Sequence, residues 1–130
     1  MAEARRLFSI LVAEDDDAHR DLLGQVFSAQ GWTVHLVPNG QEALKIARCA
    51  PIDFSILDLH MPGLNGIETI QLLRRELKTL PCILISGQAS KEEQLQAFNA
   101  GAFTFLHKPI ELAMLRQAVE RLIHRHFSGA

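Results

Sequence analysis

The chain has 130 residues, of which 48% are hydrophobic and 22% are charged, and its formal net charge is −2. This length suits one globular domain, and the balanced charge excludes a broad basic surface for nucleic acid and a long acidic tail. No apolar run is long enough to span a membrane, and no secretion signal is recognised. Cys49 and Cys82 lack metal-ligand spacing, so we expect reduced thiols in a cytoplasmic protein, with Cys82 buried in a strand.

Short apolar runs alternate with amphipathic stretches along the chain. Short apolar runs are typical of strands in a covered sheet, and apolar residues three and four positions apart are typical of helices. The expected order, with approximate bounds, is strand 8–13, helix 17–30, strand 32–37, helix 39–50, strand 52–57, helix 65–77, strand 82–86, helix 90–99, strand 102–106 and helix 110–126.

Polar residues that accept backbone hydrogen bonds precede four of these helices. Asp17, Asn39, Asn65 and Ser90 are the predicted N-caps. Asn39 is followed after three residues by Glu42, and Ser90 by Glu93, which is the spacing of a capping box. The apolar faces of three helices are predicted to include Leu22, Leu23, Val26, Phe27, Ile67, Ile70, Leu73, Leu77, Leu112, Leu115, Val119 and Leu122.

Five strand–helix units in strict alternation predict an α/β fold with a doubly wound parallel sheet. Right-handed crossovers leave few topologies, and the flavodoxin-like (βα)5 strand order 2-1-3-4-5 suits five units. That order places a crevice at the carboxyl ends of strands 1 and 3. We expect one domain over residues 1–130, with its core at about residues 8–126.

Polar residues stand where four of the strands end. Glu14 and Asp15 follow the first strand, Asp58 the third, Ser86 the fourth and Lys108 the fifth. Carboxylates that lie close together repel one another unless a cation is present. Hard oxygen ligands with room for water suit Mg²⁺. The sequence therefore predicts a magnesium site formed by the three acids.

These residues also supply the groups that phosphoryl transfer requires. A backbone carbonyl such as that of His60 would complete the protein ligands of the metal. Asp58 offers a nucleophilic oxygen, and Lys108 and Ser86 offer donors for phosphoryl oxygens. A turn-forming role for Asp58 and helix capping by the acids after the first strand explain these positions less well.

The chain resembles the receiver domain of response regulators (CheY-like) in two-component signalling, from the first strand to the last helix. Each motif alone is weak, but the ordered set is specific. The matching motifs are Ile10-Leu-Val-Ala-Glu-Asp-Asp16, Asp58-Leu-His-Met-Pro-Gly63, Asn65-Gly-Ile-Glu68, Ile85-Ser-Gly87, and Gly101 with Lys108-Pro109.

The resemblance implies a role for each site residue. Asp58 would be the phosphoacceptor, and Glu14 and Asp15 would be the acidic pair that holds Mg²⁺. Ser86 would be the hydroxyl switch residue and Lys108 the lysine of the family's site. The peptide bond before Pro109 would be cis.

Four positions depart from the common family pattern or modulate it. Phe105 stands where the family has its switch aromatic, and it lacks the hydroxyl of the tyrosine found in many members. His60 and Gln88 stand where family members tune the lifetime of the phosphoryl group. The imidazole of His60 either slows the entry of water or orients water for hydrolysis. Glu14 is a longer ligand than aspartate and reaches the metal directly or through water.

The expected function is that of a phosphorylation-controlled switch rather than an enzyme, although the domain would assist its own Mg²⁺-dependent phosphotransfer and dephosphorylation. A sensor histidine kinase or a phosphotransfer protein would donate the phosphoryl group. The switch would then reshape the face formed by the helix at 90–99, the strand at 102–106 and the helix at 110–126. This face would bind a partner, an output domain outside the chain or a second copy, with no direct binding to nucleic acid or membrane.

Three alternatives belong to other classes. A phosphorylation-independent pseudo-receiver, acting as an interaction module, is the strongest of them, although none of the five expected residues is missing. A haloacid-dehalogenase-type phosphatase needs a second aspartate two residues after the first, where this chain has His60. A flavodoxin-type FMN site needs a phosphate-binding loop after the first strand, where Glu14 and Asp15 would repel the phosphate.

Overall fold

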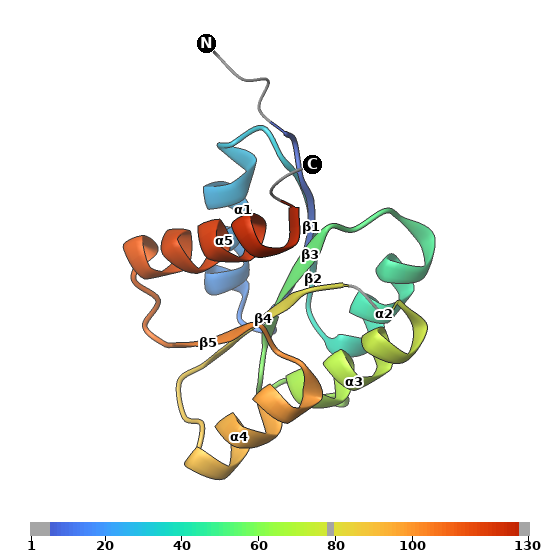
Figure 1. The fold of residues 1–130 in the computed structure, drawn as a ribbon, viewed down its shortest axis with the longest axis vertical. Coiled ribbons are helices and arrows are strands. Elements are labelled where there is room, and N and C mark those ends of the chain that lie inside the picture. The colour runs from blue at the N-terminus through green and yellow to red at the C-terminus, as the bar shows by residue number, and fades with distance from the viewer. Residues whose placement is uncertain (1–5, 78–79, 128–130) are drawn as a thin grey trace.

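The structure is a computed structural model that describes residues 6–77 and 80–127. Within these residues, strands and helices alternate along the chain (Figure 1). Their bounds are β1 Ser9–Ala13, α1 Asp17–Ser28, β2 Thr33–Val37, α2 Gly40–Cys49, β3 Phe54–Asp58, α3 Gly66–Glu76, β4 Cys82–Ser86, α4 Lys91–Ala100, β5 Thr104–His107 and α5 Leu112–Phe127. No helix in the described part of the chain is long and apolar enough to cross a membrane.

The strands form one parallel sheet in the order β2-β1-β3-β4-β5, as predicted. Helices cover both faces, with α1 and α5 on one side and α2, α3 and α4 on the other (Figure 1). All five strands run in the same direction, so their carboxyl ends meet at one edge. This edge carries every predicted site residue that follows a strand.

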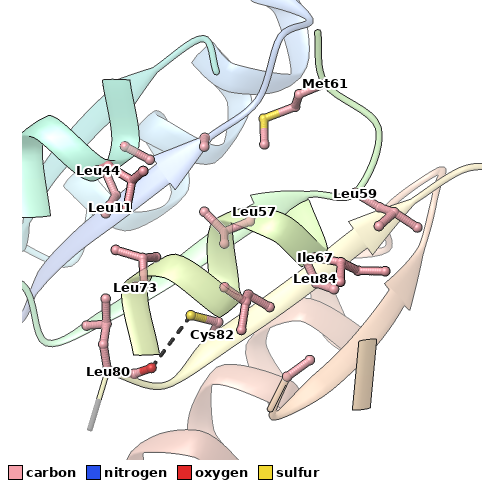
Figure 2. Packing of buried hydrophobic residues seen from close by; sticks show 14 of the residues in the cluster. Leu11, Leu44, Leu57, Leu59, Met61, Ile67, Leu73, Leu80, Cys82 and Leu84 are labelled. Atoms are coloured by element: carbon pink, nitrogen blue, oxygen red, sulfur yellow. Dashed lines mark hydrogen bonds between the residues drawn. The ribbon is translucent and has the colours of Figure 1, made fainter. Parts of the chain in front are cut away.

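Two apolar cores fill the space between the sheet and the helices. Successive side chains of a strand point to opposite faces, so Leu11 lies in the core beneath α2, α3 and α4 whereas Ile10 lies in the core beneath α1 and α5. Figure 2 shows the first of these cores, which includes Leu57 of β3, Leu84 of β4, and Ile67 and Leu73 of α3. Each fully buried side chain of this size contributes roughly 1.5–3 kcal/mol.

Cys82 lies in the same core, as predicted for a strand thiol. Its Sγ lies 3.6 Å from the carbonyl oxygen of Leu80 (Figure 2) and 2.9 Å from the hydroxyl of Ser55, which donates to it. Burial raises the pKa of this thiol to about 11. Cys49, by contrast, is exposed, and both cysteines are free thiols.

The helix N-caps agree with the sequence except at α1. Asn39, Asn65 and Ser90 each accept a backbone N–H from the first turn. Full capping boxes form at Asn65 and Ser90, whereas the box expected at Asn39 lacks the return bond from the side chain of Glu42. The prediction of Asp17 as the first cap is wrong. Asp16 is the cap and accepts the N–H of His19 at 2.9 Å, while Asp17 is already the first helical residue. Either aspartate can cap a helix, so the sequence could not decide between them.

Some predicted apolar faces are also narrower than expected. Leu22, Leu77 and Leu112 were expected to face inward but are exposed. Leu77 is the C-cap of α3 and Leu112 is the first residue of α5, so both lie at the ends of their helices. Leu22 lies beside the buried stripe of α1, which consists of Leu23, Gly24 and Phe27.

Candidate functional site

Three acidic side chains converge at the carboxyl edge of the sheet. Asp58 is the last residue of β3, and Glu14 and Asp15 directly follow β1, its neighbour in the sheet. One carboxylate oxygen from each of the three lies within 4.8 Å of the others. Glu14 is 0% exposed and Asp58 is 4% exposed, whereas Asp15 faces solvent. The cluster is therefore mostly desolvated and open on the side of Asp15.

Glu14 is held in place by its own loop and by the first helix. Its Oε2 accepts the backbone N–H of Asp16 at 3.0 Å. Its backbone carbonyl accepts a hydrogen bond of 2.9 Å from Nη1 of Arg20. Neither contact was predicted, because both depend on the direction in which α1 leaves the strand. The first contact holds the buried carboxylate in place, and the second holds the backbone of the same residue.

Lys108 brings one positive charge to two of the carboxylates. It follows β5, and its Nζ lies 2.9 Å from Oε1 of Glu14 and 3.2 Å from Oδ2 of Asp58. It donates a hydrogen bond to Asp58, whereas its contact with Glu14 is an ion pair without hydrogen-bond geometry, and Oε1 of Glu14 has no hydrogen-bond partner among the described residues. One cation among three carboxylates leaves the cluster negatively charged.

The pKa values of the two buried acids move in opposite directions. Burial, followed by the neighbouring Glu14 carboxylate, raises the pKa of Asp58 to about 7. Burial alone would also raise the pKa of Glu14, but the N–H of Asp16 and the Lys108 ammonium outweigh it and hold this pKa below its ordinary value. At neutral pH the carboxyl groups of Asp58 and Glu14 therefore resist carrying two negative charges together, and a bound cation would favour the doubly charged state.

The donor set fits Mg²⁺. All three side chains offer hard oxygen atoms, Oε1 of Glu14 is buried without a hydrogen-bond donor, and the exposed side of Asp15 leaves room for water. When bound, the ion would neutralise the carboxylates and the charge on transferred oxygens. The backbone carbonyl of His60, two residues after β3, stays a predicted further ligand.

Ser86 and His60 lie together beside the acids. Ser86, the last residue of β4, is fully buried, and its hydroxyl lies 3.2 Å from Nδ1 of His60. The same hydroxyl accepts the backbone N–H of Gln88 at 3.2 Å. Nε2 of His60 lies 3.0 Å from Oε2 of Glu93 in α4. The sequence identified Glu93 as a capping residue but gave no sign that it meets His60, 33 residues away.

Phe105 lies apart from the carboxylates. It is half-buried in β5, packs against the core beneath α4, and meets the ring of His107 edge to face at 5.3 Å between centroids. With Met114 and Pro109 it lines a cavity of about 400 Å³. The peptide bond between Lys108 and Pro109 is cis.

Comparison with known proteins agrees with this arrangement. The family model of the response regulator receiver domain matches residues 10–120. The response regulator MprA of Mycobacterium ulcerans is 35% identical over 116 residues, which are 89% of this chain and 50% of that protein. The regulatory protein AtoC of Escherichia coli is 32% identical over 114 residues, which are 88% of this chain and 25% of that protein.

Solved structures show the same fold. A CheY-like receiver domain protein from Methanospirillum hungatei superposes with a TM-score of 0.90 over 96% of this chain and 100% of its own, at 22% identity. The non-phosphorylated HemR receiver domain of Leptospira biflexa gives 0.82 at 30% identity, over 88% of this chain and 93% of its own. The chain spans about half of MprA and a quarter of AtoC. By sequence and by fold, the chain belongs to the response regulator receiver domain family of two-component systems.

Proposed function

We propose that Asp58 accepts a phosphoryl group, with Mg²⁺ held by Glu14, Asp15 and Asp58. A receiver domain is a phosphoacceptor rather than a classical enzyme. The observation that carries the assignment is the convergence of three carboxylates and one lysine at the ends of β1, β3 and β5. Such a set supplies the nucleophile, the metal ligands and a donor for the transferred oxygens.

The environment of each carboxylate supports Asp58 as the nucleophile. Oε2 of Glu14 is occupied by the N–H of Asp16, and Glu14 has no exposed surface. Asp15 lies outside the buried part of the cluster. Asp58 is the last residue of a buried strand, so its carboxylate is rigidly placed. Lys108 donates a hydrogen bond to one of the carboxylate oxygens.

In the proposed reaction, an oxygen of Asp58 forms a bond to phosphorus while the bond from phosphorus to the donor breaks. The donor would be the phosphohistidine of a sensor histidine kinase or of a phosphotransfer protein. Lys108 already lies within reach of Asp58, and the Ser86 hydroxyl would turn towards the new phosphoryl oxygens. His60 and Gln88, which both contact this hydroxyl, would tune the lifetime of the phosphoryl group.

The response would appear on the face formed by α4, β5 and α5. Large apolar side chains are exposed there, at Leu95 and Phe98 of α4 and at Met114 of α5. Exposed apolar groups of this kind favour an interaction surface. Phe105, half-buried in β5, would act as the switch aromatic by changing between inward and outward positions.

We infer three kinds of partner for this face: a second copy of the domain, an output domain or a separate protein. Several similar proteins carry names of transcriptional regulators and are about twice as long as this chain. Residues 1–130 would form a single receiver domain with a core at about 8–126, acting in the cytoplasm where the kinase presents its phosphohistidine. Direct contact of this domain with nucleic acid or a membrane is not part of the proposal.

Intact mass after incubation with acetyl phosphate tests the proposal. The wild-type protein should gain one phosphoryl group only when Mg²⁺ is present, with acetate as the leaving group. Asp58→Asn should gain none, whereas Asp21→Asn, on an exposed acid of α1, should behave as wild type. Absence of the adduct, together with failure to bind beryllofluoride, would favour the pseudo-receiver that signals through protein contacts alone.

A further inference from the structure

The imidazole of His60 contacts side chains on two different elements. Its Nδ1 lies 3.2 Å from the hydroxyl of Ser86 at the end of β4. Its Nε2 lies 3.0 Å from Oε2 of Glu93 in the first turn of α4. The ring therefore joins the proposed phosphoryl-binding hydroxyl to the helix that carries exposed Leu95 and Phe98.

The charge of Glu93 fixes the direction of the hydrogen bond at one end. Its Oε1 accepts the backbone N–H of Ser90 at 3.1 Å, which completes the capping box of α4. That N–H, and then His60, lower the pKa of Glu93, so the side chain is ionised at neutral pH. An ionised carboxylate only accepts hydrogen bonds, and His60 therefore donates from Nε2.

The direction at the other end follows from the number of protons on the ring. While the ring is neutral it carries one proton, so a donating Nε2 leaves Nδ1 as an acceptor. Ser86 must then donate its hydroxyl proton to Nδ1. The hydroxyl oxygen already accepts the N–H of Gln88, and it has no second proton to offer. The proton that a phosphoryl oxygen would need is therefore directed at His60.

We propose that His60 is a positioning residue that withholds the Ser86 hydroxyl in the unphosphorylated domain and couples its release to the start of α4. This inference rests on the proposed phosphorylation of Asp58. When Ser86 donates to a phosphoryl oxygen, Nδ1 of His60 loses its hydrogen-bond donor. The ring is then held only by Glu93 at Nε2, so the contact between His60 and α4 is weakened. Coupling is reciprocal, so a partner that moves the first turn of α4 away from His60 strengthens phosphoryl binding.

The substitution Glu93→Gln reverses this chain of hydrogen bonds without removing it. The capping box keeps the carbonyl oxygen of the new amide on the N–H of Ser90, so the amide NH₂ faces Nε2 of His60. The ring must then carry its proton on Nδ1 and donate to Ser86, whose own proton becomes free. His60→Phe removes the acceptor altogether and retains an aromatic ring of similar shape. Glu92→Gln makes the same change of charge in the same turn of α4 and is the matched control.

The first measurement is the equilibrium affinity for beryllofluoride in the presence of Mg²⁺. The NMR signals of the backbone amides report the binding. Glu93→Gln and His60→Phe should each bind roughly two- to tenfold more tightly than wild type, the range expected for one hydrogen bond lost from the free state. Glu92→Gln should bind as wild type. Unchanged affinity in both test variants would overturn the proposal.

The second measurement is the nitrogen chemical shifts of the His60 ring, which identify the protonated nitrogen. The free wild-type protein should carry the proton on Nε2, and Glu93→Gln should carry it on Nδ1. Beryllofluoride should change the Nδ1 signal of wild type as Ser86 departs. A wild-type ring protonated on Nδ1 would also overturn the proposal. If beryllofluoride binds to no variant, the proposed function fails and the switching role fails with it, whereas the ring signals in the free protein still report the hydrogen bond itself.

Discussion

The ammonium group of Lys108 lies 2.9 Å from Oε1 of Glu14, a carboxylate with no exposed surface. The same ammonium lies 3.2 Å from Asp58, so it compensates two desolvated negative charges. Burial lowers the pKa of Lys108, but the carboxylates of Glu14 and Asp58 outweigh burial and raise it above its ordinary value. Lys108 is therefore charged throughout the physiological pH range. Without it, the repulsion between the carboxylates of Glu14 and Asp58 would not be compensated.

The substitution Lys108→Met should lower the free energy of unfolding by about 2–4 kcal/mol at pH 8 without Mg²⁺, because it breaks a buried ion pair. At pH 5 the loss should be smaller, since Asp58, with a pKa of about 7, is then protonated. Urea unfolding at both pH values measures the difference. Lys45→Met, on an exposed pair with Glu42, should change stability by less than about 0.5 kcal/mol. An equal loss at both pH values would assign the effect to the methylene chain rather than to the charge.

The raised pKa of Asp58 predicts that the metal-free domain becomes less stable as the pH rises. The folded pKa of about 7 exceeds the ordinary value of 3.8, so the folded protein binds more protons than the unfolded chain between about pH 4 and pH 7. Stability from this group is therefore present at low pH and is lost as the pH rises through 7. Mg²⁺ should flatten the dependence, because it favours the charged carboxylate.

Asp58→Asn isolates this contribution, since other titrating groups are common to both proteins. At pH 8 without Mg²⁺ the variant should be more stable than wild type by roughly 1–3 kcal/mol, and the difference should shrink towards pH 5. Thermal unfolding between pH 5 and pH 8, with and without Mg²⁺, measures it. A variant less stable than wild type at pH 8 would show that the negative charge of Asp58 is favourable in the folded state.

The main parts of this site could be predicted because parallel strands share an edge. Glu14, Asp58, Ser86 and Lys108 each follow or end a strand, so the alternating pattern alone brings them together. The contact between His60 and Glu93 could not be predicted in the same way. It depends on the path of two loops and on side-chain orientation, which no local pattern encodes.

Boundaries and faces were predicted less accurately for a related reason. Asp16 and Asp17 are equally good caps, and only the path of the chain after β1 selects the first. Leu22 is as apolar as Leu23, but the packed stripe of α1 is too narrow to cover it. The sequence shows which residues are apolar and so favour burial. The area of the surface that a helix packs against determines which of them are buried.

Gly66 permits α3 to begin directly against the end of β3. A Cβ atom there would lie 2.6 Å from the carbonyl oxygen of Asp58 and 2.9 Å from Cα of Leu59. Backbone atoms cannot move aside cheaply, so Gly66→Ala should lower the free energy of unfolding by roughly 1–3 kcal/mol and should displace the loop after Asp58. Gly87→Ala is the matched control, because its Cβ would find its nearest neighbour, Cβ of Lys108, at 3.6 Å.

The substitution Gly66→Ala should change both the free energy of unfolding, measured with urea, and the affinity for beryllofluoride. The affinity should fall in Gly66→Ala, since the displaced carbonyl belongs to the proposed phosphoacceptor. Gly87→Ala should retain the stability of wild type within about 0.5 kcal/mol. Equal stability of Gly66→Ala and wild type would mean that α3 moves away from β3 without cost.

The exposed apolar side chains of α4 should serve association rather than stability. Leu95 is 62% exposed and Phe98 is 49% exposed, and they lie one helical turn apart on the outer side of the helix. Leu95→Ala should therefore change the free energy of unfolding by less than about 0.5 kcal/mol. Leu84→Ala, in the core of the sheet, should lower it by about 2–5 kcal/mol.

Sedimentation with Mg²⁺ and beryllofluoride then tests what the surface binds. If a second copy is the partner, the wild-type protein should associate when beryllofluoride is added, and Leu95→Ala should associate more weakly while binding beryllofluoride with unchanged affinity. An apolar side chain of this size stabilises a complex through the surface that binding removes from water. The effect of the substitution should therefore appear in the association constant alone. A wild-type protein that remains monomeric with bound beryllofluoride would exclude the homodimer and leave an output domain or a separate protein as the partner of α4.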